Sequence, residues 1–396
     1  MASKLTMAAQ SGIFPVGQVA IPTPPPFVAT TVLFPNTAAL PSLTKESLTF
    51  AYAGDPYANF YYGGVDTPTS TAFAIAIATM EGGCTAVLAP SGQSATVATM
   101  SALLKQGDHL MVVDTITHTT RWYIERLRAG GIEVTYYDPK LGAAALDDAR
   151  ANTRMIFMES PGALTYEVQD VPAICDVAAR RKIISVLDNT WSASQFFAPF
   201  DHGVDISILS LSKYHAAPAG ISLGAIVTNN RTFYEQIKNE AALLGLHVSP
   251  DACAKASNSL TSICLRLKHQ EQTASIVIDG LSGRPEIKQI VHPSRTDCVG
   301  HDLWRRHFTG ANSLITLEFN ALSESQVHSI ANTFRLVKIG YGWGGITSLV
   351  TIFKANEWRA VSKSANAGTC MRIYAGLEDP HDILQDIESA LDAVAS

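Results

Sequence analysis

Lysine, aspartate and hydroxyl residues follow several apolar runs of this chain, and together these residue types suit one kind of chemistry. Lys213 ends the stretch "LSLSK", behind Ser210 and Ser212. A partly buried lysine amine has a lowered pKa and becomes a nucleophile towards carbonyl groups. The two serines lie on the same side of an extended segment and could hold phosphate oxygens. The alternative interpretation is that Lys213 is an ordinary solvated lysine. The motifs elsewhere in the chain distinguish the two interpretations.

Two further apolar runs end in residues of complementary chemistry. Asp188 follows "IISVL", where a carboxylate can cap a helix, bind a metal or bind a protonated ring nitrogen. Gly92 and Gln93 follow "TAVLAPS" and open a helical pattern, whose backbone N–H groups can hold a phosphate. A phosphate cradle, a carboxylate and an imine-forming amine are what pyridoxal phosphate needs.

The elements that must position these residues alternate between helix and strand from about residue 66. A helix is expected over 70–83 and a strand over 85–90. Further expected strands are 109–114, 132–138, 154–160, 183–190 and 205–212, and the helices between them include 119–131 and 171–182. Strands that are apolar throughout and separated by helices indicate a mostly parallel sheet covered on both faces, with ligands at the carboxyl ends of its strands.

The two ends of the chain have different patterns. Residues 1–60 carry too many prolines for a packed helix and are expected to form an arm lying on a neighbouring surface. After about residue 250 the pattern becomes mixed, with one long helix over 257–281, a helix over 323–333 and a terminal helix. We expect an arm over 1–60, a large α/β domain over 61–250 and a smaller α+β domain over 251–396.

Composition excludes several classes of protein. The 396 residues carry a net charge of −6, and no basic block is longer than "ARRK", so nucleic-acid binding has little support. No apolar run reaches about 18 residues, which argues against a membrane span, and no secretory signal is evident. The six cysteines form no CxxC pair, so we expect reduced thiols, no metal site and a cytoplasmic protein.

Several motifs give the chain a resemblance to a known family. They are "ESPGALTYEVQDVPAI" (159–174), "VLDNTWSA" (186–193), "LSLSKY", "YGWGG" (341–345) and "MRIYAGLEDPHDIL" (371–384). The chain resembles the Cys/Met-metabolism family of pyridoxal-phosphate enzymes, and most of all its β-lyase members. The resemblance implies an aspartate-aminotransferase-like fold (fold type I) and a homotetramer made of two tight dimers, with active sites shared across each dimer.

The resemblance also implies roles for individual residues. Lys213 is similar to the Schiff-base lysine and Asp188 to the partner of the pyridinium nitrogen, and Arg372 matches the arginine that binds the substrate carboxylate. The matching phosphate contacts are Gly92, Gln93, Ser210, Ser212 and, reaching into the adjacent subunit, Tyr62. Tyr341 and Trp343 match residues at the substrate end, and Thr117 stands at a cofactor-contacting position.

Departures from the family pattern point to a changed substrate. Thr117 replaces a tyrosine that stacks on the cofactor and transfers protons; His118 and Tyr123 are candidate substitutes. Gly64 replaces a phosphate-binding arginine, and Val65 and Trp122 remove charges expected near the distal end of cystathionine. The stretch "AAPAG" after Lys213 replaces a polar stretch.

These observations predict a pyridoxal-phosphate-dependent lyase that performs β- or γ-elimination on a small L-amino acid. Without the tyrosine, a leaving group that needs little acid assistance is favoured, such as the halide of 4-chloroallylglycine, whose loss gives an alkyne side chain. The alternatives are a cystathionine β-lyase or another carbon–sulfur lyase, a γ-replacement synthase, and a catalytically inactive cofactor-binding protein.

Overall fold

A computed structural model describes residues 3–40, 57, 60–363 and 368–395 of the chain. By its contacts the chain divides into two compact units. Unit 1 comprises residues 1–106 and 198–264, and unit 2 comprises residues 107–197 and 265–396. The division into domains at residues 60 and 250 stays a prediction. Among the described helices, none is long and apolar enough to cross a membrane.

Unit 1 is built on three strands, β3 (Thr85–Ala89), β8 (Ile206–Leu209) and β9 (Gly224–Thr228). β9 lies between the other two and is antiparallel to both. Its helices are α1 (Lys4–Gln10), α2 (Pro68–Glu81), α3 (Gly92–Leu103), α6 (Arg231–Leu243) and α7 (Pro250–Leu260). The predicted helix over 70–83 and strand over 85–90 are confirmed as α2 and β3 within two residues.

Strand β9 is not among the predicted strands, and its first residue explains why. Gly224 weakens the strand pattern, because glycine inside a strand usually marks a break or a close approach of backbone. Here it is a close approach, since a Cβ at this position would lie 2.2 Å from the carbonyl oxygen of Ser91. β9 therefore passes directly against the turn that begins α3.

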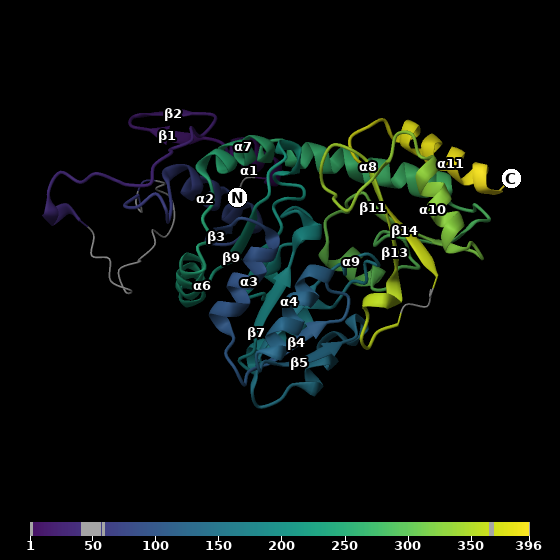
Figure 1. Cartoon of the computed structure of the whole chain (residues 1–396), viewed down its shortest axis with the longest axis horizontal. Coiled ribbons are helices and arrows are strands. Elements are labelled where there is room, and N and C mark those ends of the chain that lie inside the picture. Colours follow the sequence, from purple (N-terminus) through teal and green to yellow (C-terminus); the bar gives the residue numbers. More distant parts are fainter. Residues whose placement is uncertain (1–2, 41–56, 58–59, 364–367, 396) are drawn as a thin grey trace. The chain divides into compact units, whose positions relative to one another are not determined.

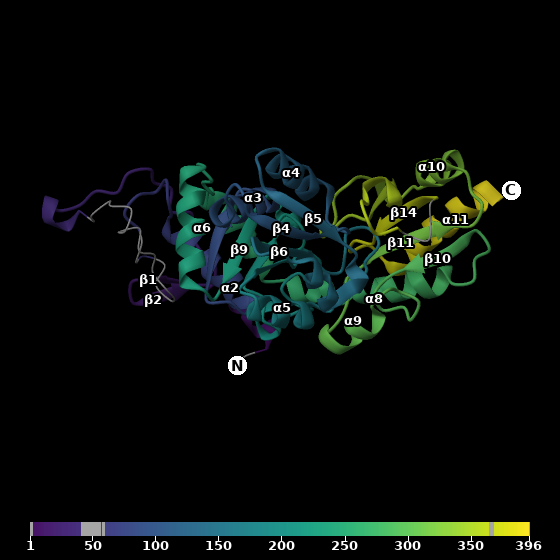
Figure 2. The same cartoon turned by 90° about the horizontal axis from the view of Figure 1, so that it is seen from below.

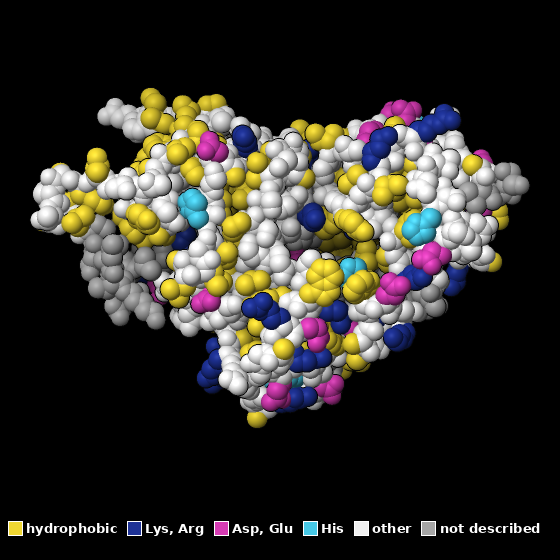
Figure 3. Space-filling model, in the orientation of Figure 1, with side chains coloured by type: hydrophobic (Ala, Val, Ile, Leu, Met, Phe, Trp, Pro, Cys, Tyr) yellow, Lys and Arg dark blue, Asp and Glu magenta, His cyan; other side chains and the backbone are white. Residues whose placement is uncertain are grey.

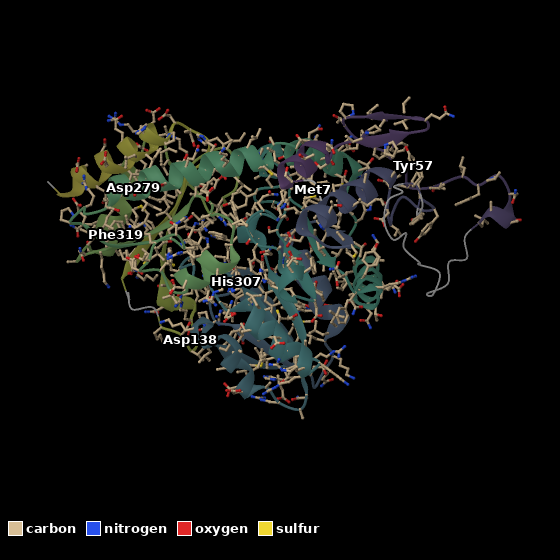
Figure 4. All side chains as sticks on the ribbon, turned by 180° about the vertical axis from the view of Figure 1, so that it is seen from behind. Met7, Tyr57, Asp138, Asp279, His307 and Phe319 are labelled. Carbon is tan, nitrogen blue, oxygen red and sulfur yellow. The ribbon has the colours of Figure 1, made fainter. Side chains whose placement is uncertain are left out.

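The beginning of unit 1 is more ordered than the proline content predicts. After α1, the strands β1 (Phe14–Val16) and β2 (Val19–Ile21) form an antiparallel hairpin. The ring of Tyr57 contacts those of Phe14 and Phe27, and its hydroxyl donates to the carbonyl of Pro15 at 3.1 Å, beside the hairpin (Figure 4). Hydrophobic side chains cover the hairpin's surface (Figure 3), and Val19 is 66% exposed.

Unit 2 contains the parallel part of the fold. Its strands are β4 (His109–Val113), β5 (Glu133–Tyr137), β6 (Thr153–Glu159) and β7 (Ile184–Asp188). They pair in parallel in the order β7-β6-β4-β5, which confirms the predicted strands and their direction. The helices α4 (His118–Ala129) and α5 (Val171–Arg180) lie on opposite sides of these strands (Figure 2).

Unit 2 also holds a second sheet, of five strands in the order β10-β11-β14-β13-β12 (Figure 1). The strands are β10 (Ile287–Val291), β11 (Leu314–Phe319), β12 (Lys338–Ile339), β13 (Leu349–Lys354) and β14 (Thr369–Tyr374). The helices α8 (Ile263–Leu281), α10 (Glu324–Thr333) and α11 (Pro380–Ala395) pack their apolar faces on it, while α9 is His301–His307. The predicted helices over 323–333 and at the terminus are confirmed.

The single long helix expected over 257–281 is wrong, because the chain forms α7 and α8 there with a break at Thr261 and Ser262. Thr261 Oγ1 donates to the carbonyl of Asn258 at 2.8 Å, and Ser262 Oγ donates to that of Ser259 at 3.3 Å. Such side-chain bonds compete with the hydrogen bonds of a helix and favour its interruption.

Candidate active site

The N-terminus of α3 presents backbone N–H groups in unit 1. Ser91 caps the helix, and a capping box joins it to Ser94, whose N–H donates to Ser91 Oγ at 3.0 Å. Gly92 and Gln93 are the first two residues of the helix. Their N–H groups point out of the helix end, where the macrodipole stabilises an anion such as a phosphate.

Ser210, directly after β8, lies against Gly92. A Cβ on Gly92 would lie 2.5 Å from Ser210 Cβ and 2.7 Å from Ser210 Oγ. Only glycine lets the helix end and the strand end meet this closely. The structure therefore brings two of the predicted phosphate contacts into direct contact.

Lys213 is attached to the same strand end by a tight turn. Its N–H donates to the carbonyl of Ser210 at 3.1 Å, and its own carbonyl accepts from Ala217 at 2.9 Å. Ser212 Oγ is bound to the backbone of Leu223, donating to the carbonyl at 3.0 Å and accepting from the N–H at 3.0 Å. Both side chains are half-buried. Ser212 thus braces the turn that carries Lys213.

In unit 2, two carboxyl groups end neighbouring strands. Asp188, the last residue of β7, is paired in register with Glu159, the last residue of β6. Asp188 Oδ1 accepts the N–H of Thr190 at 3.0 Å. Burial and the nearby charge of Asp188 raise the pKa of Glu159 well above its usual value. A raised pKa favours the protonated form of Glu159 beside Asp188. Glu159 is not among the predicted site residues, although its place at a strand end is a signal.

Thr117 lies at the N-terminus of α4. Its N–H donates to Glu159 Oε2 at 2.7 Å, while its side chain makes no capping hydrogen bond. This backbone bond connects the start of α4 to the strand that pairs with β7. The residue after it, His118, packs its ring on Trp358 with 4.2 Å between the ring centroids. Tyr123 lies on the same helix, half-buried.

Arg372 lies in the middle of β14 and is 9% exposed. Its Nη2 donates to the carbonyl of Tyr341 at 2.7 Å and to Thr351 Oγ1 at 3.1 Å. The guanidinium of Arg372 therefore contacts the backbone carbonyl of Tyr341, while the Tyr341 side chain is 86% exposed. Trp343, two residues further on, is half-buried.

Tyr62 is 51% exposed in unit 1, in a single β-bridge to Thr31. A Cβ on Gly64 would lie 2.8 Å from Cε1 of the Tyr62 ring. Gly64 thus leaves room for this ring at the position where the family pattern has an arginine.

Each unit, taken by itself, offers groups whose chemistry suits part of pyridoxal phosphate. Unit 1 offers a helix N-terminus with the Ser210 hydroxyl for a phosphate, and a half-buried amine on the same turn. Unit 2 offers the Asp188 carboxyl group beside Glu159, whose pKa is raised, and a carboxylate suits a ring nitrogen that must stay protonated. No group of histidine, cysteine, aspartate and glutamate in the described part of the chain has a metal-binding arrangement.

Known proteins match the chain over nearly its whole length. The family model for Cys/Met metabolism PLP-dependent enzymes matches residues 24–392. A putative cystathionine β-lyase of Rhizobium johnstonii is 34% identical over 94% of this chain and 92% of the relative. An L-alanine/L-glutamate racemase of Wolbachia pipientis is 31% identical over 93% of this chain and 92% of the relative.

Solved structures match the fold. A cystathionine γ-synthase from Xanthomonas oryzae pv. oryzae, in complex with aminoacrylate and cysteine, has a TM-score of 0.86 at 22% identity, covering 100% of this chain and 99% of that one. This agreement confirms the predicted fold class.

Proposed function

Because the chain belongs to the Cys/Met-metabolism family of PLP-dependent enzymes, we propose that it is a lyase for small L-amino acids whose leaving group departs with little acid assistance. A halide is such a group, and 4-chloroallylglycine is a concrete candidate substrate. The observation that carries this proposal is Thr117, which has no ring and keeps its backbone N–H on Glu159. A short aliphatic hydroxyl is a poor proton donor to a departing thiolate.

Four groups of the chain carry the reaction in this proposal. Arg372, already oriented by Tyr341 and Thr351, binds the substrate carboxylate through its guanidinium. The Lys213 amine removes the proton from Cα, and for γ-elimination it also removes a proton from Cβ. Asp188 keeps the ring nitrogen of the cofactor protonated, and Glu159 lies beside it at the end of β6. When bound, the cofactor withdraws electrons from Cα and so makes its proton acidic.

The phosphate of the cofactor is held by the N–H groups of Gly92 and Gln93 and by the hydroxyls of Ser210 and Ser212. Ser212 donates to this phosphate only after releasing Leu223, so its first role is to hold the Lys213 turn. Tyr62 serves the phosphate of an adjacent subunit in the homotetramer, and its 51% exposure in the single chain supports that role. Size-exclusion chromatography with light scattering tests the tetramer. The cytoplasmic location stays a prediction.

A carbon–sulfur lyase is the second candidate function, because relatives at 30 to 34% identity carry the name cystathionine β-lyase. The γ-synthase and inactive-protein alternatives have weaker support. The γ-synthase structures are 22% identical and speak for the fold alone.

A substrate panel separates these functions. The purified holoenzyme is given 4-chloroallylglycine, β-chloroalanine, cystathionine, an O-acylhomoserine and L-alanine, and the products, ammonia and chloride are quantified. We expect chloride release from the haloamino acids, with about 10²–10⁴-fold less in Lys213→Ala because a positioned base is lost. Brisk turnover of cystathionine with no chloride release contradicts the proposal and favours the carbon–sulfur lyase.

A further inference from the structure

Three aromatic rings, those of His118, Trp122 and Trp358, contact one another in unit 2. His118 and Trp122 lie on α4, and Trp358 belongs to the short helical turn Ala355–Trp358 after β13. The His118 and Trp358 centroids are 4.2 Å apart, and the Trp122 ring meets Trp358 edge-on at 6.3 Å. Trp122 is 60% exposed. We call these three side chains the aromatic wall.

The aromatic wall borders a small, open pocket. His118 and Trp358 line it directly, together with Ile116, Leu164 and Ala355. On this side the pocket presents rings and aliphatic carbon. Contact with an apolar group would remove this apolar surface from water.

The charged residues that also line this pocket are already neutralised by protein partners. Asp114 is ion-paired with Arg121 at 2.8 Å and accepts the N–H groups of residues 360–362. Arg359 is ion-paired with Glu167 at 2.6 Å and also donates to Thr165. A ligand that brought its own ammonium and carboxylate groups would have to break these pairs or stay unpaired, which is unfavourable.

The pocket lies beside position 117 on the chain. Ile116 and His118 flank Thr117, the residue that replaces the family tyrosine. Burial lowers the pKa of His118, and the charges of Arg121 and Arg372 lower it further, against the opposing effect of Glu357. The lowered pKa favours the neutral form of the His118 ring. Leu164, which lines the pocket, accepts a hydrogen bond from the hydroxyl of Thr316 at 2.7 Å, and Thr316 is paired in register with Arg372.

We propose that His118, Trp122 and Trp358 determine the specificity of the enzyme, by packing against an uncharged, apolar or halogenated side chain of the amino-acid substrate and disfavouring one with a charged distal end. This inference rests on the proposed function and names the substrate class of that site. Tryptophan faces also attract cations, so the experiment must include a substrate with a distal ammonium.

The test compares kcat/KM values of the holoenzyme for 4-chloroallylglycine, β-chloroalanine and cystathionine. In Trp358→Ala we expect kcat/KM for 4-chloroallylglycine to fall by about 10- to 200-fold, the range for lost apolar contacts in a pocket, mostly through KM. β-Chloroalanine, whose side chain is shorter, changes less, and Trp358→Phe restores most of the loss. In Trp122→Asp we expect kcat/KM for cystathionine to rise relative to kcat/KM for 4-chloroallylglycine. Val361→Ala is the matched control, because Val361 is 54% exposed on the same loop and its N–H bond to Asp114 is kept.

A binding readout keeps this test independent of turnover. In Lys213→Ala loaded with cofactor, saturation-transfer NMR measures contact between protein protons and the side chain of L-allylglycine. We expect saturation of the side-chain protons, reduced when Trp358→Ala is added. If the wild type eliminates nothing yet this contact is present, the proposed function fails and the specificity surface stands. Equal losses for all three substrates, or a larger loss for cystathionine in Trp358→Ala, overturn the inference. Because Trp122 is exposed, Trp122→Asp tests the aromatic wall even if Trp358→Ala does not fold.

Discussion

Gly92 and Ser210 meet so closely that a single methyl group at position 92 would lie 2.5 Å from Ser210 Cβ and 2.9 Å from Ser210 Cα. The end of β8 and the start of α3 are thereby fixed against each other, and the proposed phosphate contacts depend on this packing. Because one of the clashing atoms is backbone, a rotamer change cannot relieve the contact.

Gly92→Ala should therefore lower the free energy of unfolding by about 1–3 kcal/mol, as overpacking does. It should also weaken cofactor binding by about tenfold. The substitution displaces the helix end, and a loss of about 1.4 kcal/mol of binding free energy raises Kd tenfold. Denaturant unfolding and cofactor absorbance after dialysis measure the two quantities. Val97→Ala on the same helix serves as the control. A Gly92→Ala protein that binds the cofactor as tightly as the wild type contradicts the proposed phosphate site.

The guanidinium of Arg372 gives a second prediction. Its Nη2 is held by Tyr341 and Thr351, which orients the planar group for a two-pronged carboxylate contact. A lysine keeps the charge but not this geometry. We expect Arg372→Lys to lower kcat/KM for every amino-acid substrate by about 10- to 100-fold, the worth of a charged hydrogen bond. Steady-state kinetics checks this, and an unchanged KM refutes the carboxylate role.

The local chemistry of the site followed from the sequence because it lies at the ends of recognisable strands. Asp188, Ser210 and Lys213 each follow an apolar run, and the runs are strands β7 and β8. The helix that starts at Gly92 was likewise evident from its position after "TAVLAP". In each case the residues that do the chemistry are neighbours in sequence of the element that positions them.

What the sequence could not predict depends on contacts between distant segments. Asp114 holds residues 360–362, nearly 250 positions further along the chain, and nothing in either segment alone indicates the other. Trp358 likewise becomes part of the aromatic wall only through its contact with α4. Gly224 resembles a strand breaker until its contact with the Ser91 carbonyl is known.

Asp114 makes stability depend on pH. Burial alone would raise its pKa, but the N–H groups of Ala360, Ser362 and Val361 and the guanidinium of Arg121 outweigh burial and hold the pKa below its usual value. The folded state therefore binds this proton less tightly than the unfolded state. The contribution is fully present above the unfolded value of about 4 and is lost as pH falls through the lower folded value.

Asp114→Asn should accordingly destabilise the protein by about 3 kcal/mol at neutral pH, because it leaves Arg121 buried without its charge partner. The difference in free energy of unfolding between the variant and the wild type should stay constant down to about pH 5 and shrink below about pH 4. Denaturant unfolding at a series of pH values tests both parts. A difference that grows on acidification would show that the carboxylate is not what holds residues 360–362.

Thr117 allows the proposed leaving-group preference to be reversed. Its side chain is half-buried and makes no capping hydrogen bond. Its backbone N–H donates to Glu159 and its carbonyl accepts from the N–H of Arg121, and any residue at this position retains both bonds. Thr117→Tyr adds a ring and an acidic hydroxyl at the position where the family has them.

We expect Thr117→Tyr to raise the turnover of cystathionine by at least about tenfold, the lower part of what a positioned proton donor contributes, and to change chloride release from haloamino acids little. Thr117→Phe separates the two effects, because it supplies the ring without the hydroxyl. If Thr117→Phe and Thr117→Tyr raise cystathionine turnover equally, position 117 of the wild type lacks ring stacking rather than a proton donor. If neither changes cystathionine turnover, the residue at position 117 does not set the leaving group, and the halide proposal loses the observation that carries it.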